Sequence, residues 1–437
     1  MNMRKTFSIL FCLFCAVAPL AGQDTLKQAP ERTFTIKPSH WTRGEYRAGA
    51  LPAENGSGEA MFLMSSTMVQ LDFAQKGLEI RFAPKFFGVW GSSSSGGIGV
   101  DEAWFGLRSR GGLFLRIGHQ KLAYDDERII GANDWAMVAS THDLLKAGYD
   151  GEKHKIHLLV AFNQNDENIN GGTYYANGAQ PYKMMQTLWY HFDPFPQWGN
   201  SLLFINTGMQ NPSDPAENVN EYQQLFGVFS DWHPANFSVQ ASYYRQTGRN
   251  EYSLPINAWM TSAEAAWRIN PAWRINTGYF YMSGDEYFFV PFAGAIGMAL
   301  KTEVRGFNPI FGSHHKFYGA MDFFYVTTYY GGNTPGLQDF HAGGKWTPSK
   351  SFDLNAAYHL LATSVLVDDL PLTMGHELEL TASWNIMKNV SLQAGYSFMK
   401  GTETMERLKR TGDKNNLHWG WLMFIVNPEF FSIKLHK

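Results

Sequence analysis

Charged and uncharged residues alternate with a period of two along much of the chain. Between residues 42 and 48, Arg43, Glu45 and Arg47 stand at every second position, with Gly44 and Tyr46 between them. Successive side chains of a β-strand point to opposite faces, so this period predicts strands with one polar and one apolar face. The same alternation recurs at residues 78–85, 102–110, 377–386 and 391–398.

The length and the spacing of these segments separate two all-β architectures. A soluble β-sandwich and a membrane barrel both produce alternation. The segments here are as long as the roughly 9–11 residues that a tilted membrane strand needs, and longer than the usual soluble strand. They follow one another as hairpins, and the connections alternate between short and long. Short periplasmic turns and long outer loops are typical of outer-membrane barrels.

The number of strands follows from parity. About 19 segments resemble strands, whereas single-chain bacterial barrels close on an even number. If residues 317–330 spanned the membrane, the short turn at 347–350 would face the wrong side, so we assign them to one large outer loop, 285–335. We therefore predict an all-β fold, a transmembrane antiparallel up-and-down β-barrel of about 18 strands, wide enough to hold a water-filled channel.

The start of the chain has the parts of a secretory signal peptide. Arg4 and Lys5 precede an apolar run at residues 7–20, and small residues follow. The run is shorter than the roughly 20 apolar residues of a membrane helix, although an uncleaved anchor is the alternative. We predict a signal peptide at 1–22 and a single barrel domain at 23–437 in the bacterial outer membrane. Cys12 and Cys15 would leave with the signal, which excludes disulfides from the mature chain.

Composition agrees with a lipid-facing barrel. Aromatic residues make up 15% of the chain and charged residues 17%, against about 25% charged residues in a typical soluble protein. The formal net charge of −3 argues against a nucleic-acid partner. Residues 417–431 form an aromatic segment that ends in Phe430 and Phe431, which predicts a closing strand that the outer-membrane assembly machinery would recognise. We expect the lipid bilayer and that machinery as partners.

Several polar motifs resemble the alginate-export porin family. The first group is a Gly-x-Gln at Gly118, a Tyr-Asp at Tyr124, an Arg-x-x-Gly at Arg128 and an Asp-Trp at Asp134, followed by Asp143. A second group lies at residues 307–322 and 336–339. The family pattern has Arg where this chain has His119.

The resemblance implies an 18-stranded barrel whose lumen carries cations that guide an anionic polysaccharide. Charged rings set the selectivity of pores, so we expect an anionic or carbohydrate solute and a modest anion preference carried by unpaired cations. The alternative is that these charges pair among themselves and only solvate the lumen, and the acidic residues near Glu264, Asp353 and Glu377 count against uniform anion selectivity. The predicted pore-lining residues are Arg43, Glu45, Arg47, Glu79, Arg81, Lys85, Glu102, Arg108, Arg116, Gln120, Arg128, Asp134 and Asp143.

Other functions find less support in the sequence. A barrel-embedded hydrolase would need a nucleophile beside an oriented histidine, and no such cluster stands out, so we expect no enzyme. A secreted or outer-membrane carbohydrate-binding β protein remains a further alternative. His314, His315 and Asp322 lack a suitably spaced third ligand, so we expect neither a metal nor a cofactor. The aromatic run at 323–330 could stack on sugars or pack a loop over the barrel mouth.

Overall fold

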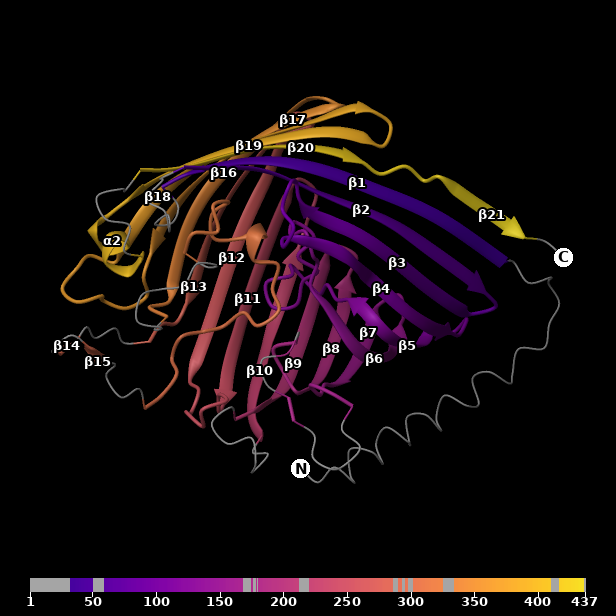
Figure 1. The fold of residues 1–437 in the computed structure, drawn as a ribbon, viewed down its shortest axis with the longest axis horizontal. Helices are drawn as coiled ribbons and strands as arrows, with labels where there is room; N and C mark the ends of the chain where they lie inside the picture. Colours follow the sequence, from indigo (N-terminus) through magenta and orange to yellow (C-terminus); the bar gives the residue numbers. More distant parts are fainter. Residues whose placement is uncertain are drawn as a thin grey trace.

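Antiparallel strands form one closed sheet in the computed structural model of this protein (Figure 1). The structure describes residues 32–49, 59–167, 174–175, 178, 180–211, 220–285, 290–292, 295–297, 302–324, 334–409 and 416–435. The predicted signal peptide lies outside these ranges. The strands of the sheet are β1 (Arg32–Ala48), β2 (Glu59–Gln75), β3 (Leu78–Val89), β4 (Gly96–Arg108), β5 (Leu113–Lys121), β6 (Thr141–Asp150), β7 (His154–Phe162), β8 (Met184–Phe195), β9 (Trp198–Gln210), β10 (Asn220–Trp232), β11 (Phe237–Gly248), β12 (Ala258–Asn270), β13 (Trp273–Met282), β16 (Leu337–Ser349), β17 (Phe352–Ala362), β18 (Thr373–Met387), β19 (Val390–Gly401), β20 (Asn416–Val426) and β21 (Phe431–Leu435).

The barrel closes where the two ends of the chain meet. The C-terminal half of β1 pairs with β20, from His40 opposite Val426 to Ala48 opposite His418. The first residues of β1 pair with β21. β20 and β21 are therefore two parts of one barrel strand, and the 19 strands of the sheet make 18 barrel strands. This confirms the predicted fold class, although the closing strand extends to Leu435 and does not end at Phe431.

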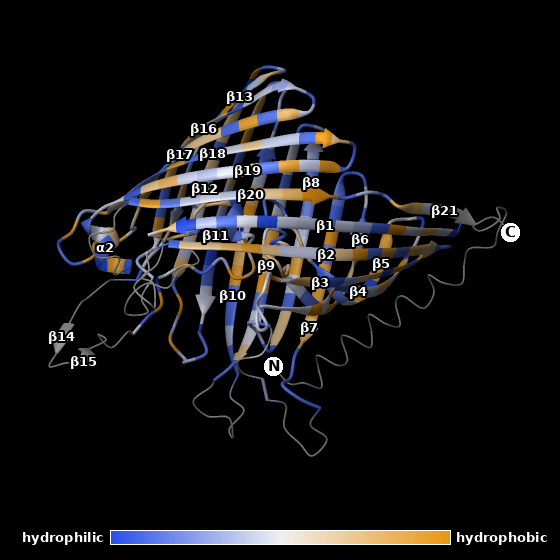
Figure 2. Ribbon diagram, turned by 45° about the horizontal axis from the view of Figure 1, so that its top comes forward, coloured by the Kyte–Doolittle hydropathy of each residue, from blue (hydrophilic) through white to orange (hydrophobic). Residues whose placement is uncertain are grey.

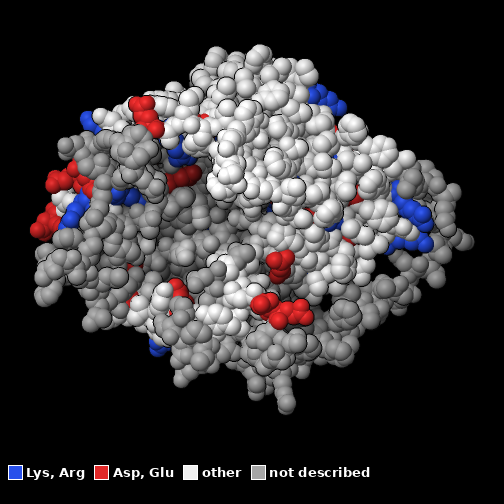
Figure 3. Space-filling view, in the orientation of Figure 1, with Lys and Arg blue, Asp and Glu red and all other residues white. Residues whose placement is uncertain are grey.

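The alternation sorts side chains between the membrane and the lumen. Phe82, Phe105 and Leu422 point outward and are about half exposed, whereas Arg43 and Glu45 point inward and are buried. Figure 2 shows the alternation as blue and orange bands along the strands, and Figure 3 shows a wide uncharged area over β17, β20 and β1. At the short-turn end, aromatic rings of neighbouring strands stack in pairs, as in the aromatic girdle of a membrane barrel. These pairs are Phe195 with Trp198, Phe237 with Trp267, and Trp273 with Trp346.

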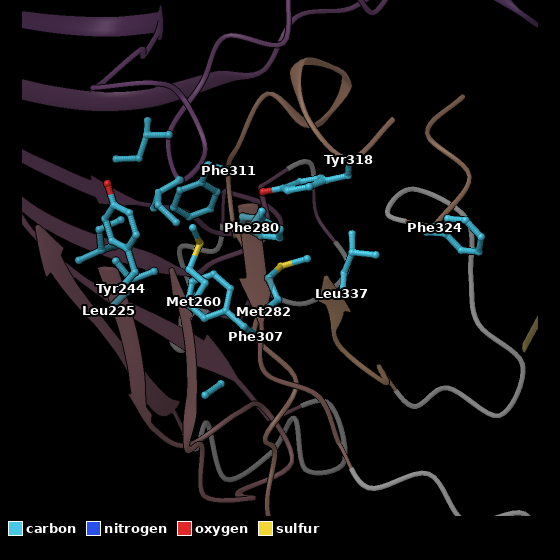
Figure 4. Packing of buried hydrophobic residues seen from close by; sticks show 14 of the residues in the cluster. Leu225, Tyr244, Met260, Phe280, Met282, Phe307, Phe311, Tyr318, Phe324 and Leu337 are labelled. Carbon is cyan, nitrogen blue, oxygen red and sulfur yellow. The ribbon is translucent and has the colours of Figure 1, made fainter. Parts of the chain in front are cut away.

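Two connections fold back into the barrel. We call residues 122–140, between β5 and β6, lumen loop 1, and residues 302–324, from the connection between β13 and β16, lumen loop 2. Ile130 and Phe311 of these loops pair through a β-bridge, and Tyr318 is buried against Phe280 of the wall (Figure 4). The interior is thus partly filled by the chain itself, which the sequence did not predict.

The remaining elements lie outside the sheet. The hairpin β14 (Val290–Phe292) and β15 (Ala295–Gly297) belongs to the connection between β13 and β16, together with the short helix η2 (His314–Lys316). The helix α2 (Glu403–Lys409) follows β19. Among the described residues, no helix has both the length and the apolar character that a membrane crossing needs.

Candidate functional site: the barrel lumen

The predicted pore-lining cations of β3 lie on the inner face and are engaged with carboxylates. Arg81 Nε lies 2.7 Å from Asp72 Oδ1, and Arg81 Nη1 lies 2.9 Å from Glu102 Oε2. Lys85 Nζ lies 3.0 Å from Asp101, which also accepts Lys121 at 2.6 Å. Each cation is therefore compensated locally, which reduces the field it projects into the lumen.

A second group of charges lies nearer the short-turn end. Arg108 bridges Glu79 at 3.1 Å and Asp150 at 3.0 Å. Arg116 is bound more loosely, because its nearest oxygen on Glu79 is 3.7 Å away and its Nε has no hydrogen-bond partner in the described structure. The Arg116 guanidinium instead lies 3.7 Å from the centre of the Trp104 ring. Arg116 is thus the least compensated of the arginines predicted from β1, β3, β4 and β5.

The charges of β1 connect the wall to lumen loop 1. Glu45 accepts Arg43 at 2.8 Å, Arg47 at 3.0 Å and the indole N–H of Trp419 at 2.9 Å. Arg43 also donates to the backbone carbonyl of Trp135 at 3.0 Å and lies 3.9 Å from the centre of that ring. The Arg43 side chain therefore orders lumen loop 1 and is almost completely withdrawn from solvent.

Arg128 is the central charge of lumen loop 1. Its guanidinium pairs with Asp126 at 2.8 Å and with Glu264 of β12, and it lies 3.9 Å from the centre of the Phe317 ring. Only 2% of the Arg128 surface is exposed. Burial raises the pKa of Asp126 although Arg128 opposes the shift. Arg128 thus joins lumen loop 1, lumen loop 2 and the wall, and does not line an open passage.

The other three predicted residues differ in position. Gln120 is fully buried and donates to the backbone carbonyl of Leu144 at 3.2 Å. Asp134 lies exposed in lumen loop 1, 2.8 Å from Lys121. Asp143 does not line the pore as predicted, because its neighbours His142 and Leu144 point inward and alternation turns Asp143 outward. There it pairs with His119 at 3.0 Å.

The two lumen loops are bonded to each other. Gly131 N donates to Phe311 O at 2.8 Å, and Phe311 N donates to Ile129 O at 3.1 Å. Glu127 accepts the Ser313 hydroxyl at 2.9 Å and also binds Lys316. The loops therefore form one layered insert inside the barrel.

Lumen loop 2 is also fixed to the wall. The backbone N–H groups of Ala320 and Met321 donate to the carboxylates of Glu379 and Glu377 on β18, the latter at 2.9 Å. Gly319 has φ +85°, and a Cβ there would lie 2.2 Å from Glu377 Oε2, so a glycine is required at this approach. The predicted acidic face of β18 thus serves as an anchor for the loop. Burial lowers the pKa of His314 to about 4, so its imidazole adds no charge at neutral pH.

A cavity of about 660 Å³ opens below lumen loop 1, towards the short-turn end. Lys146 of β6 lines it, and within the described part of the chain Lys146 forms no ion pair. Its Nζ lies 4.9 Å from the centre of the Tyr124 ring and 5.9 Å from that of Phe114. Sequence reasoning missed Lys146, although it stands only three residues from the predicted Asp143. The cavity is also lined by Asp125, Asp150, Lys155, His157, Trp189, His191, Phe229, Asp231 and His233.

The middle of the chain matches the model of a known protein family. The family model described as alginate export matches residues 98–370, which is more than half of the sequence. The chain belongs to the alginate export family. No curated protein matches the sequence of this family member.

Solved structures share the fold of this alginate export family member at low identity. OccAB1 of Acinetobacter baumannii has a TM-score of 0.62 at 10% identity, over 91% of this chain and 97% of that chain. OccAB2 of the same organism has a TM-score of 0.61 at 10% identity, over 91% and 98%. OccK2 of Pseudomonas aeruginosa, solved in complex with glucuronate, has a TM-score of 0.58 at 11% identity, over 92% and 98%. The family and the closed barrel identify an outer-membrane, porin-like channel.

Proposed function

We propose that this alginate export family channel passes acidic saccharides, and that Lys146 with Arg116 gives it a modest preference for anions. The observation that carries the proposal is Lys146, an inward-facing cation without an ion pair among the described residues, above a cavity with aromatic walls. Tyr124 and Trp189 offer that cavity flat apolar faces, which suit a sugar ring, while the ammonium suits a carboxylate. The glucuronate bound to OccK2 supports this class of solute.

Ion pairs between the lumen cations and nearby carboxylates explain why we expect only a modest preference for anions. The cations of β1, β3 and β4 offset nearby carboxylates, so their net field is small. A single uncompensated charge about 6 Å from an anion in water changes the energy of that anion by about 0.7 kcal/mol. This corresponds to about a threefold change in local anion concentration. We therefore assign selectivity to Lys146 and Arg116 and solvation of the lumen to the paired residues.

The proposal includes no catalytic step. Both of the best-paired histidines that face the cavity are engaged with carboxylates, His157 with Asp150 at 2.8 Å and His191 with Asp193 at 3.0 Å. Their roles in the proposal are to hold the cavity in shape and to solvate a passing solute. The closing strand formed by β20 and β21 is the proposed contact with the outer-membrane assembly machinery.

Reversal potentials in planar bilayers test the proposal. Under a KCl gradient we expect the wild type to prefer chloride, and Lys146→Met to reduce the anion-to-cation permeability ratio at least about threefold, because the charge attracts the anion and repels the cation. Lys388→Met is the matched control, because it removes the same charge from an exposed turn between β18 and β19. Cation preference in the wild type, or equal ratios for Lys146→Met and the wild type, would show that Lys146 does not set selectivity.

Adding glucuronate tests the solute class in the same recordings. We expect glucuronate to interrupt the current of the wild type at lower concentration than it interrupts that of Lys146→Met. Glucose carries the same ring without the carboxylate and should interrupt both channels equally. Equal sensitivity of the wild type to glucose and glucuronate would argue for a passage that does not select acidic sugars.

A further inference from the structure

Two histidines and an aspartate meet on the inner face of β16 and β17. His341 and His359 stand directly opposite each other in the register of the two strands. Asp339 lies two residues before His341 and therefore shares its face. The nitrogen and oxygen atoms that these three side chains offer all lie within 4.8 Å of one another. The cluster lies away from the cavity of Lys146, and channel selectivity as proposed above does not use it.

The distances within the cluster are close to those between ligand atoms around a metal ion. Asp339 oxygens lie 2.9 and 3.0 Å from His359 Nδ1, and Asp339 Oδ2 lies 3.4 Å from His341 Nδ1. Around a zinc ion with bonds of roughly 2.0–2.2 Å, tetrahedral ligand atoms lie about 3.3–3.6 Å apart. Small shifts of the three side chains would therefore place all donor atoms around one ion. Asp339 and His359 are at least 90% buried, so such an ion would be protected from bulk water.

The surroundings hold the two rings in place. Glu379 Oε1 lies 3.4 Å from His359 Nε2, the ring nitrogen that points away from Asp339. A carboxylate on the far nitrogen fixes the tautomer and orientation of a metal-binding histidine. His341 lies over Gly278, where a Cβ would come within 2.6 Å of its Cε1 and Nε2. Any larger residue at position 278 would displace the His341 ring.

Two buried polar atoms in and beside the cluster form no hydrogen bond in the described structure. These atoms are His341 Nδ1 and Glu377 Oε2, and Glu377 is completely buried directly opposite His359 in the next strand. Unsatisfied buried polar atoms are rare because each one costs free energy. Asp339, Glu377 and Glu379 together place three carboxyl groups around the two imidazoles. A divalent cation would give His341 Nδ1 a ligand bond where the described structure shows no hydrogen bond.

We propose that Asp339, His341 and His359 bind a divalent transition-metal ion of the zinc class, with Glu379 orienting His359. Two imidazoles and a carboxylate are ligands that zinc, cobalt and nickel accept, whereas calcium and magnesium prefer oxygen alone. Three protein ligands leave a fourth position for water. This proposal departs from the sequence analysis, which considered only His314, His315 and Asp322 as ligands. In the structure His315 instead pairs with Asp322 and stacks on Trp135.

Zinc binding to the purified barrel tests the site. The full-length protein is prepared without a polyhistidine tag, stripped with a chelator and dialysed against Zn²⁺ in detergent. We expect one Zn²⁺ per barrel, and we expect His359→Ala and Asp339→Asn each to weaken binding by at least tenfold. His376→Ala is the matched control, because His376 lies on the outer face of β18 and pairs with Tyr358 at 2.7 Å. Heat-dependent gel mobility verifies that each variant is a folded barrel.

Cobalt gives a second measurement that does not depend on the variants. Co²⁺ in a four-coordinate site of nitrogen and oxygen donors absorbs visible light far more strongly than the hydrated ion, so the wild type should turn intensely blue. The proposal is overturned if the wild type binds no stoichiometric Zn²⁺, or if Co²⁺ keeps the spectrum of the hydrated ion. Equal binding by the wild type, the folded ligand variants and His376→Ala would indicate an adventitious ion only and would also overturn it.

Discussion

Replacing Arg128 with methionine should release the insert formed by the two lumen loops. Methionine keeps an unbranched aliphatic stem but removes the charge that compensates Asp126 and Glu264. Breaking a buried ion pair by removing one partner typically costs about 3–5 kcal/mol, because the remaining charge stays buried. The contact with the Phe317 ring, 3.9 Å from the guanidinium carbon, would be lost as well.

A loss of about 3 kcal/mol shifts the equilibrium between bound and released loops by about a hundredfold. Single-channel recording in planar bilayers measures the consequence. We expect Arg128→Met to show higher and noisier conductance than the wild type, while heat-dependent gel mobility shows an intact barrel. Arg407→Met is the control, because Arg407 pairs with Asp368 at 2.7 Å in a partly exposed position. Exposed pairs contribute about 0–1 kcal/mol, so its conductance should equal that of the wild type.

An unchanged, quiet conductance in a folded Arg128→Met barrel would refute this reasoning. It would mean that hydrophobic packing alone holds the loops, as between Tyr318 and Phe280. Glu264→Gln provides an intermediate test, because it removes the opposite charge on β12 and leaves the pair with Asp126 in place. We expect its conductance to lie between those of the wild type and Arg128→Met.

Two further predictions concern pH and closure. Burial alone would raise the pKa of Glu127, but hydrogen bonds from Lys316 and Ser313 outweigh it and hold the pKa below its ordinary value. The stabilisation is therefore present above about pH 4.3 and is lost as pH falls through the lowered folded pKa. Wild-type channel noise should rise in that acidic range, and that of Glu127→Gln should not. Deleting residues 431–437 should reduce outer-membrane insertion, because Arg32–Ile36 loses its partner, whereas deleting 436–437 should not. Normal fractionation of the longer deletion would show that β21 is dispensable.

The fold was predictable because its cause is local. Alternation along one strand is enough to set which face meets lipid, and parity then fixes the number of strands. The exception is β21. Phe431, Ile433 and Leu435 alternate with Ser432 and Lys434, but five residues are too few to distinguish a strand from a polar tail. Its role depends on β1, which lies at the other end of the chain.

The candidate site was less predictable because its contacts are remote in sequence. Nothing near Ile130 indicates that it pairs with Phe311, which follows 181 residues later. The face of β6 was also ambiguous, because His142, Leu144 and Lys146 point inward while Asp143 and Leu145 point outward. Polar and apolar residues occur on both faces of β6, so the sequence does not show which face points inward. Choosing the wrong face places Asp143 in the lumen and turns Lys146 towards the lipid.

The insert inside the barrel has a mechanical consequence. Lumen loop 1 leaves the wall after β5 and is tied to β8 through Asp125 and Trp189, 3.0 Å apart, and to β12 through Arg128. Lumen loop 2 is tied to β11 through Gln246 and to β18 through Glu377. A hollow cylinder flattens easily under lateral pressure, whereas one with internal struts keeps its cross-section. Any substitution that widens the passage by freeing these loops should therefore also soften the cylinder against the surrounding bilayer.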